Sequence, residues 1–256
     1  MQNFTIYLTF YGALQDFTAS PFDNSEPAPH TLSRRASIKD IIESLGVPHP
    51  EVGEIRANGG ACDFEYIPET NDRIEVYPPQ RPIDLSRPSL LRKDTLNRIR
   101  FIIDVNVAKL ATLLRAAGFD TAFDQQWHDP RLAEMSDREK RILLTKDIDL
   151  LKRKRVTFGY FVRTKYPRQQ LHEVMDVFGL HDRQEPFSRC LICNHPLEPI
   201  AKEKIMHRLQ PLTRKYYDTF HYCRNCDKIY WPGSHRENMM EVLQNRDDTD
   251  SVESDA

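Results

Sequence analysis

Two Cys-x-x-Cys pairs restrict the fold of this chain more than any other feature of its sequence. Cys190 and Cys193 form the first pair, Cys223 and Cys226 form the second, and 29 residues separate them. Two such pairs offer four thiolates to one cation, which is the ligand set of a tetrahedral Zn²⁺ site. Zinc bound by four cysteines has no open coordination position, so we predict a structural ion that does no chemistry. Redox thiols are the alternative, but no thioredoxin-like pattern surrounds either pair.

Cysteine usage and hydropathy indicate the compartment in which such a chain works. No apolar run approaches the roughly 20 residues of a membrane-spanning helix, so we expect no membrane contact. The first residues, MQNFTIYLTFYG, lack a basic segment and a small-residue cleavage site, which argues against a secretory signal. Paired cysteines without such a signal favour metal binding in a reducing cytoplasm over disulfide bonds. The sequence has nine glycines and no Gly-rich nucleotide motif, so we expect no small-molecule cofactor.

Charge is distributed unevenly along the 256 residues. Residues 1–83 carry a net charge of −6, residues 84–186 carry +5, residues 187–246 carry +4, and the last ten residues carry −5. A basic body between acidic ends is the pattern that a phosphate-binding surface leaves in a sequence. Solvated faces of an ordinary protein are the competing interpretation, because a pI of about 6.5 is low for a nucleic-acid-binding protein.

The first 82 residues have the pattern of a small α/β domain. The segment 3–11 alternates with a period of two and predicts a strand. Ser37 is placed to cap a helix that ends at Gly46. Residues 54–57 and 73–77 predict two further strands, and this order of elements resembles the ubiquitin-like, sulfur-carrier type of fold.

Two proline-rich stretches are predicted to lack regular structure. Residues 21–30 combine Pro, Asp, Asn and Ser, as loops do. Four prolines predict a stiff linker to the next domain. They are Pro78, Pro79, Pro82 and Pro88.

The following segment alternates short apolar strands with amphipathic helices. Strands are predicted at residues 100–104, 121–123, 141–145 and 160–163, and helices at residues 107–118, 129–140 and 168–178. This alternation indicates a parallel sheet that helices cover on both faces.

Carboxylates follow two of these strands. Asp104 ends the first, and Asp147 and Asp149 follow the strand at 141–145. Ligands of open α/β sheets gather beyond the carboxyl ends of the strands. Clustered carboxylates repel one another unless a hard cation neutralises them, so the pattern favours a Mg²⁺ or Mn²⁺ site for phosphodiester hydrolysis. The competing interpretation for each aspartate is a helix cap or a solvated strand end.

Other polar residues surround these two groups. Acids on or near the helix at 129–140 can lean over the same sheet edge: Asp129, Glu134, Asp137 and Glu139. Basic residues that can hold an RNA backbone are Lys109, Arg115, Lys146, Lys152, Arg153, Lys154 and Arg155. Histidines near the cysteines are interpreted as surface or RNA-contacting residues rather than zinc ligands: His195, His207, His221 and His235.

Four stretches carry a family resemblance, in this order: FIIDVNVAKLATLLRAAGFDT, RILLTKDIDLLKR, PFSRCLICNHPLEPI and CRNCDKIYWPGSHRENM. They resemble the mut-seven C-terminal RNase family, whose members are PIN-like nuclease domains with an attached zinc ribbon. Residues 1–82 look like the ubiquitin-like module of many bacterial members. Thr112 departs from the family, because an aromatic residue is expected in that helix. The ubiquitin-like segment ends in Tyr77-Pro78-Pro79 and lacks the terminal Gly-Gly needed for activation as a sulfur carrier.

The resemblance implies an α/β protein with a ubiquitin-like β-grasp domain at 1–82, a PIN-like RNase domain at 98–185 and a zinc ribbon at 186–243. A disordered acidic tail is expected at 244–256. By resemblance, Asp104, Asp147 and Asp149 are catalytic acids. Glu134 is the expected helical acid of the site, with Asp129 and Asp137 as alternatives.

The expected function is that of a metal-dependent ribonuclease with a structural Zn²⁺ and a catalytic Mg²⁺ or Mn²⁺. The alternative is a non-catalytic RNA- or ribosome-binding module, in which the zinc ribbon contacts RNA. A third hypothesis is an adaptor that binds a protein partner through the ubiquitin-like domain.

Overall fold

The computed structural model describes residues 3–22, 25–233 and 239–243. They form a mixed α/β protein with a mixed sheet in the N-terminal region and a parallel sheet further along the chain. Two compact units are distinguished, Met1–Arg98 with Trp127–Phe161, and Ile99–Gln126 with Val162–Ala256. The acidic tail expected at 244–256 lies outside the described residues.

No helix among the described residues combines the length and apolar character needed to cross a membrane.

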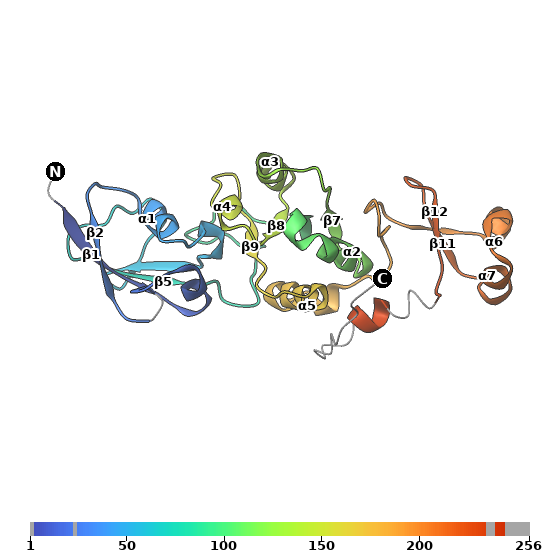
Figure 1. The fold of residues 1–256 in the computed structure, drawn as a ribbon, viewed down its shortest axis with the longest axis horizontal. Helices are drawn as coiled ribbons and strands as arrows, with labels where there is room; N and C mark the ends of the chain where they lie inside the picture. Colours follow the sequence, from blue (N-terminus) through green and yellow to red (C-terminus); the bar gives the residue numbers. More distant parts are fainter. Residues whose placement is uncertain (1–2, 23–24, 234–238, 244–256) are drawn as a thin grey trace. The chain divides into compact units, whose positions relative to one another are not determined.

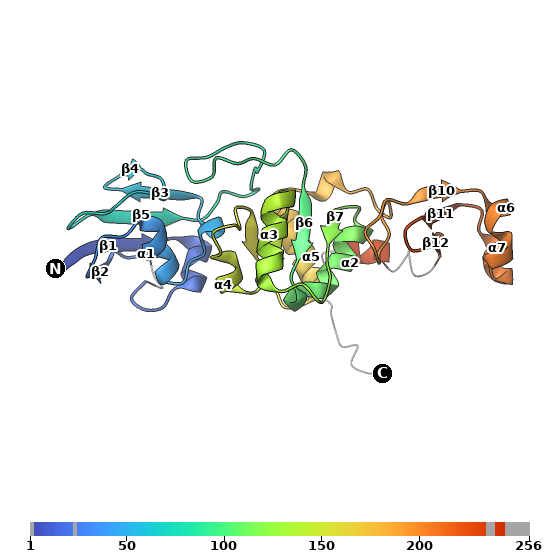
Figure 2. The same cartoon turned by 90° about the horizontal axis from the view of Figure 1, so that it is seen from above.

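A five-stranded sheet begins the first unit, in the order β2-β1-β5-β3-β4. Its strands are β1 (Phe4–Phe10), β2 (Ala28–Leu32), β3 (Glu54–Ala57), β4 (Gly60–Ala61) and β5 (Arg73–Tyr77). β1 runs parallel to β5, and the other pairs are antiparallel. Helix α1 (Ile38–Ser44) lies across one face of the sheet (Figures 1 and 2). Alternation along β1 places Ile6, Leu8 and Phe10 in the core, where all three are fully buried.

The ends of α1 follow the sequence prediction. The Ser37 hydroxyl accepts a hydrogen bond from the Asp40 N–H at 3.2 Å and so caps the helix. Gly46 follows the last turn with a φ of +110°, and a Cβ there would lie 2.3 Å from the Phe17 carbonyl oxygen. Glycine is therefore required at this position by backbone conformation and by space.

Strand β2 corrects the prediction of a loop at residues 21–30. β2 pairs with β1 and stands at the edge of the sheet, where Pro29 is the register partner of Tyr7. Proline cannot donate a ladder hydrogen bond, but an edge strand tolerates it because one side needs no partner. The prolines therefore did not exclude a strand.

The proline-rich linker is packed rather than free. Leu85 and Leu96 are 6% and 4% exposed, and the Leu96 N–H donates to the Leu85 carbonyl at 2.8 Å. The Arg92 guanidinium lies over the Phe158 ring, 5.7 Å from its centroid. The buried leucines and the contact of Arg92 thus attach this segment to its own unit.

The rest of the first unit contains two strands and two helices. They are α3 (Asp129–Glu139), β8 (Ile142–Thr145), α4 (Ile148–Leu151) and β9 (Gly159–Phe161). β8 and β9 are parallel, with Thr145 in register with Phe161. The short helix α4, between Asp147 and Lys152, is not predicted by the sequence pattern.

Strand β9 ends a four-stranded sheet of order β7-β6-β8-β9. The 3-10 turn η2 (His49–Glu51), which precedes β3, lies against β9. Glu51 is 5% exposed, and its Oε1 accepts a hydrogen bond from the Phe161 N–H at 2.7 Å. The Phe17 and Phe161 rings meet edge to face at 5.2 Å. The N-terminal domain therefore covers this end of the edge strand.

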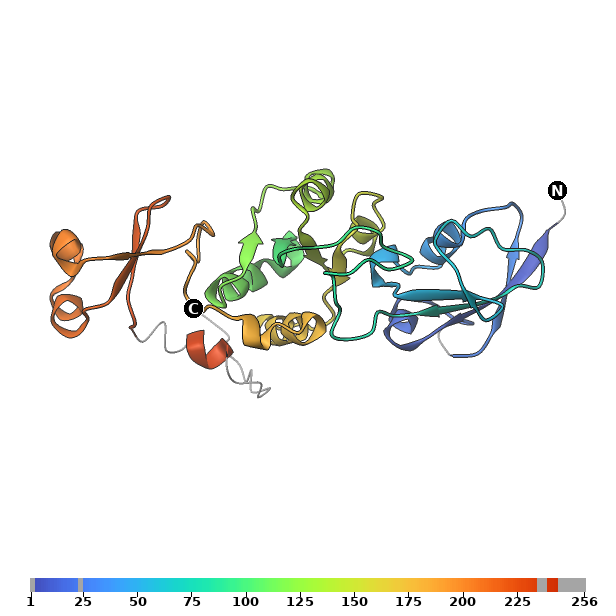
Figure 3. The same ribbon diagram turned by 180° about the vertical axis from the view of Figure 1, so that it is seen from behind.

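The second unit contains two further parallel strands. They are β6 (Arg100–Ile103) and β7 (Asp120–Ala122), which are parallel. Helices α2 (Ala108–Ala116) and α5 (Pro167–Phe178) pack against each other (Figure 3). All of these elements begin and end close to the predicted residues, because each one has a clear apolar pattern.

The cysteine-containing part of the second unit is a three-stranded antiparallel sheet of order β10-β11-β12. Its strands are β10 (Glu198–Ile200), β11 (Phe220–Cys223) and β12 (Lys228–Tyr230), and α6 (Lys202–Ile205) and α7 (Pro211–Tyr216) connect the first two. A small core of Ile205, Leu209 and Phe220 lies beneath them. The remaining 3-10 turns are η1 (Gly12–Phe17), η3 (Val105–Val107), η4 (His181–Arg183) and η5 (Met206–Arg208).

Candidate metal centre and nuclease residues

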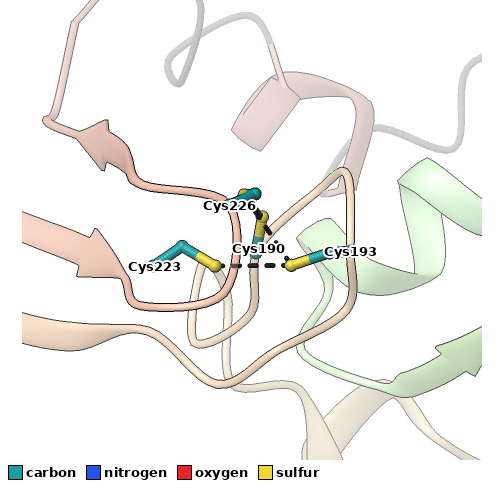
Figure 4. Close-up of side chains that lie close together, drawn as sticks. All are labelled: Cys190, Cys193, Cys223 and Cys226. Atoms are coloured by element: carbon teal, nitrogen blue, oxygen red, sulfur yellow. Dashed lines mark hydrogen bonds between the residues drawn. The ribbon is translucent and has the colours of Figure 1, made fainter.

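The side chains of the four paired cysteines converge on one point. Figure 4 shows them reaching inward from two loops, and all four sulfurs lie within 4.8 Å of one another. Cys193 Sγ lies 3.3 Å from Cys223 Sγ and 3.7 Å from Cys226 Sγ. Four sulfurs bound tetrahedrally to zinc at about 2.3 Å stand about 3.8 Å apart. The cluster therefore fits a tetrahedral metal ion such as Zn²⁺.

The chemistry of the sulfurs also fits a cation. Burial raises the pKa of Cys190, but the N–H groups of Cys193 and Ile192 and the Tyr230 hydroxyl outweigh this effect and lower it to about 6. Burial raises the pKa of Cys226, and the neighbouring sulfurs raise it further. The pKa of one sulfur is therefore lowered while that of its neighbour is raised. A bound divalent cation would favour the thiolate form of every ligand, because it stabilises negative charge.

The same turn closes both Cys-x-x-Cys loops. The residue after the second cysteine has a left-handed backbone in each loop, with φ of 66° at Asn194 and 56° at Asp227. Asn and Asp adopt this conformation more readily than most other residues. N–H groups of the two loops consequently point at the first sulfur of each pair. An Asn or Asp directly after each pair was a signal of this turn already present in the sequence.

Polar contacts attach the first cysteine loop to β7. The Asn194 side chain accepts a hydrogen bond from the Thr121 N–H at 2.9 Å and donates one to Asp120 at 2.8 Å. Arg189 donates to the Gly118 carbonyl at 3.2 Å. These hydrogen bonds attach the first cysteine loop to β7 and to Gly118 just before it.

Arg115 completes this attachment and corrects a sequence prediction. It is 4% exposed. Its guanidinium donates to the carbonyls of Thr121, Leu191 and Ile192 at 2.9, 3.1 and 2.7 Å. Arg115 therefore joins α2 to the cysteine loop and does not present its charge to RNA. Burial lowers the pKa of Arg115, while the nearby Cys190 and Cys193 sulfurs raise it.

Tyr230 is a partner of the cluster that sequence reasoning missed. Its hydroxyl lies 3.1 Å from Cys190 Sγ. The pKa of Tyr230 is raised, mainly because the side chain is buried and also because of this hydrogen bond. Tyr230 is four residues after Cys226, at the end of β12. A strand predicted directly after the second cysteine pair could have indicated this position.

Asp104 directly follows β6 and is 6% exposed. Its carboxylate caps the turn η3, accepting hydrogen bonds from the Val105 N–H at 2.6 Å and from the Asn106 side chain. Burial of a polar group without hydrogen-bond partners is costly, and these two donors offset that cost. The competing interpretation of a cap is therefore observed for Asp104.

Asp147 is also a cap. Its Oδ1 accepts hydrogen bonds from the Asp149 and Leu150 N–H groups at 2.8 and 3.0 Å. Its own N–H donates to Thr145 Oγ1 at 2.9 Å. Asp147 Oδ2 has no hydrogen-bond partner within the described parts of the chain. The Asp149 side chain is 93% exposed and lies 3.9 Å from the Lys152 ammonium.

The acids on α3 all form ion pairs. Glu134 pairs with Arg131 at 3.0 Å and with Arg138 at 3.5 Å. Asp137 pairs with Lys140 at 3.1 Å, and Asp129 pairs with Arg153 at 3.2 Å. In the ranges that the structure describes, the four cysteines are the one group of three or more potential metal ligands; three or more of the candidate carboxylates do not meet in such a group there.

The remaining predicted RNA-binding residues differ in exposure. Lys109, Lys154 and Arg155 are exposed, and Arg153 is exposed but paired with Asp129. Lys146 is half-buried, and the Lys152 side chain is 23% exposed. Among the histidines, His195 and His207 are exposed and His221 is half-buried, whereas His235 lies outside the described residues.

Two protein-family models match this chain, each over a different stretch of the sequence. A family model described as Mut7-C RNAse domain matches residues 99–243, and one described as Mut7-C ubiquitin matches residues 3–84. A search of curated proteins and a search of solved structures each gave no significant match. The resemblance carried by the four sequence stretches is thus confirmed. Because the first match covers more than half of the chain, this protein belongs to the Mut7-C RNAse domain family and carries a Mut7-C ubiquitin domain at its N-terminal side.

Proposed function

We propose that this protein hydrolyses RNA phosphodiester bonds with Mg²⁺ or Mn²⁺ as the catalytic cation. Its membership of an RNase family supports RNA as the substrate. The observation that carries the metal-dependent form is the buried carboxylate of Asp104, directly after β6. Asp147 likewise follows a strand, two residues after the end of β8. Positions just beyond the carboxyl ends of strands are the usual setting of a ligand site in α/β proteins.

The donor set suits a hard cation. Carboxylate oxygens are the ligands that Mg²⁺ and Mn²⁺ prefer. Asp104 and Asp147 are the proposed principal ligands, and Asp149 and Glu134 complete the set, with Asp129 and Asp137 as alternatives to Glu134. The ion pairs of Glu134 are solvent-exposed, and such pairs contribute about 0–1 kcal/mol, so a cation can replace them.

The chain's own residues supply binding and orientation. The caps at Asp104 and Asp147 fix one carboxylate oxygen each through backbone N–H groups. The exposed Lys109, Lys154 and Arg155 attract the phosphate backbone. A bound divalent cation would supply an activated water and neutralise charge on the leaving oxygen.

Cleavage of single-stranded RNA by the wild type and by Asp104→Asn, with and without Mg²⁺ or Mn²⁺, tests the proposal. We expect cation-dependent cleavage by the wild type and a loss of about 100-fold or more in Asp104→Asn, because metal stabilisation amounts to several kcal/mol. Asp176→Asn, an exposed acid on α5, is the matched control and keeps wild-type activity. Thermal unfolding of both variants shows whether the fold is intact.

Equal cleavage by the wild type and Asp104→Asn, both folded, would overturn the catalytic assignment. RNA binding without cleavage by the wild type, in either cation, would instead favour the non-catalytic RNA-binding module.

A further inference from the structure

A cavity of about 940 Å³ opens in the second unit beside the cysteine cluster. Its walls come from the segment before the first cysteine loop, from that loop itself, and from β12 with the residues after it. Phe187, Ile192, Leu197, Tyr230 and Trp231 are among its apolar lining residues. Cavities of this size and character are the usual form of small-ligand sites.

The apolar lining is accessible to solvent. Trp231 is 39% exposed and Ile192 is 55% exposed. Trp231 makes no ring contact with another aromatic side chain in the described part of the chain. An exposed apolar surface around an aromatic ring is unfavourable in water unless something covers it.

The charge at the cavity favours a polyanion with flat apolar groups. His221 on β11 and Lys228 on β12 line it, and Lys228 makes no ion pair within the ranges the structure describes. Glu185 is the acid in the lining, and residues 187–246 carry a net charge of +4. Single-stranded RNA combines phosphates, which cations attract, with bases that stack on aromatic faces.

We propose that this cavity binds bases of single-stranded RNA, with the Trp231 indole as the stacking platform and Lys228 and His221 toward the phosphates. The proposal rests on the proposed function, because RNA is its ligand, and it adds a binding site outside the candidate carboxylates.

The walls of the cavity are held by the structural contacts of the metal centre. The Tyr230 hydroxyl is hydrogen-bonded to Cys190 Sγ, and the carbonyls of Leu191 and Ile192 accept hydrogen bonds from Arg115. Cavity walls that are fixed before binding lose little conformational freedom when a base enters. The zinc ribbon would thus serve as a base-binding element as well as a structural one.

The test compares a uridine oligomer with an abasic oligomer of equal length, on the zinc-loaded full chain without Mg²⁺ or Mn²⁺. Stacking predicts that Trp231→Ala weakens binding of the uridine oligomer about 5- to 150-fold and leaves abasic binding and the salt dependence unchanged. Trp231→Phe keeps most of the affinity. Tyr216→Ala removes a ring on α7 that is 64% exposed and outside the cavity, and it has no effect.

Fluorescence gives a second, direct measurement. The chain has two tryptophans, so a Trp127→Phe background leaves Trp231 as the single reporter. We expect quenching by the uridine oligomer and little change with the abasic one. Equal affinities of Trp231→Ala and the wild type, with no quenching, would overturn the site even if the wild type cleaves RNA. A wild type that binds neither oligomer would overturn the proposed function as well.

Discussion

Arg115 shows how burial changes what a charged side chain does. On α2 it is one of several basic residues, and the sequence alone suggests a contact with phosphate. In the structure its guanidinium faces three carbonyls, two of them in the first cysteine loop. A planar group with several donors can satisfy carbonyls from two segments at once, which lysine cannot do equally well.

Replacing Arg115 with methionine is therefore expected to weaken the attachment of the cysteine loop. Three carbonyls, one buried and two partly buried, lose their donor, so the free energy of unfolding falls by about 1–3 kcal/mol. Lys109→Met removes an exposed cation from the same helix and changes stability by less than about 0.5 kcal/mol. Denaturant unfolding of both variants checks the prediction, and equal stability of the two would contradict it.

Asp72 is a comparable residue in the N-terminal domain. It is 8% exposed, and its carboxylate accepts hydrogen bonds from Asn58 at 2.7 Å, Tyr66 at 2.7 Å and the Glu69 N–H at 2.8 Å. Burial raises the pKa of Asp72, but these hydrogen bonds outweigh it and lower the value overall. The charged form therefore stabilises the fold.

A depressed pKa in the folded state gives stability that is present above the unfolded pKa and lost as pH falls through the folded one. We expect Asp72→Ala to lower the unfolding free energy by about 1.5–3 kcal/mol at pH 7. The difference from the wild type should narrow from about pH 4 downward, where the unfolded carboxyl titrates. Urea unfolding at pH 7 and near pH 3 measures this difference in unfolding free energy. If the difference is the same at both pH values, the charged hydrogen-bond network is not its cause.

At the scale of elements, one glycine fixes how α2 joins β7. Gly118 has a φ of +97°, and a Cβ there would lie 2.4 Å from the Glu185 carbonyl oxygen. The backbone of the segment that leads to the cysteines thus passes directly over the end of α2, where the Glu185 N–H donates to Ala117.

Gly118→Ala is expected to destabilise the second unit by about 1–3 kcal/mol, because it combines backbone strain with a clash against main chain. Gly60→Ala is the matched control: its φ is not left-handed, and the nearest atom would be 3.6 Å away. Hydrogen exchange should show faster opening around residues 116–118 in the first variant. Unchanged exchange and an unchanged melting temperature would contradict the role of the close approach.

Elements with a clear apolar period were predictable, and those that depend on partners were not. The strand before Asp104 and the helix capped by Ser37 follow from local pattern alone. Strand β2 depends on β1 beside it, and α4 depends on the Asp147 cap, so neither has a strong period of its own.

The candidate metal centre was also predictable only in part. The four cysteines are fixed by spacing, and the sequence was sufficient to identify them. The burial of Arg115 and the bond from Tyr230 to Cys190 arise from packing between segments far apart in sequence, which spacing does not encode.

At the scale of the whole molecule, zinc removal should affect one region and spare another. Cys193→Ser or chelation is expected to unfold the ribbon while the domain at 3–84 stays folded, because its core contains no ribbon residue. Structural zinc contributes about 10–16 kcal/mol of apparent binding energy in small peptides. Limited proteolysis and metal analysis check this. Cys62→Ser is the control, because Cys62 lies outside the cluster, and this variant should bind as much zinc as the wild type. An unchanged melting profile after chelation would count against the prediction.

The uneven charge of the chain leads to a prediction about salt. Lys154 and Arg155 are exposed in the basic body, whereas Arg34 and Arg35 are exposed in the acidic N-terminal domain. If the first pair contacts two phosphates, replacing both with alanine lowers the slope of log affinity against log salt by about 1.4. Replacing Arg34 and Arg35 with alanine leaves the slope unchanged. RNA affinity across a salt series decides between these outcomes, and equal slopes for both double variants would exclude the contact.

The buried Glu51 carboxylate beneath β9 has a consequence for truncated forms of the protein. It accepts the Phe161 N–H at the outer strand of the four-stranded sheet. An uncovered outer strand offers its main-chain groups to any other strand, and this is a common origin of aggregation. A fragment that begins after residue 98 would present that strand to its neighbours and tend to self-associate. We therefore expect the ubiquitin-like domain to limit self-association of the rest of the chain by covering this outer strand.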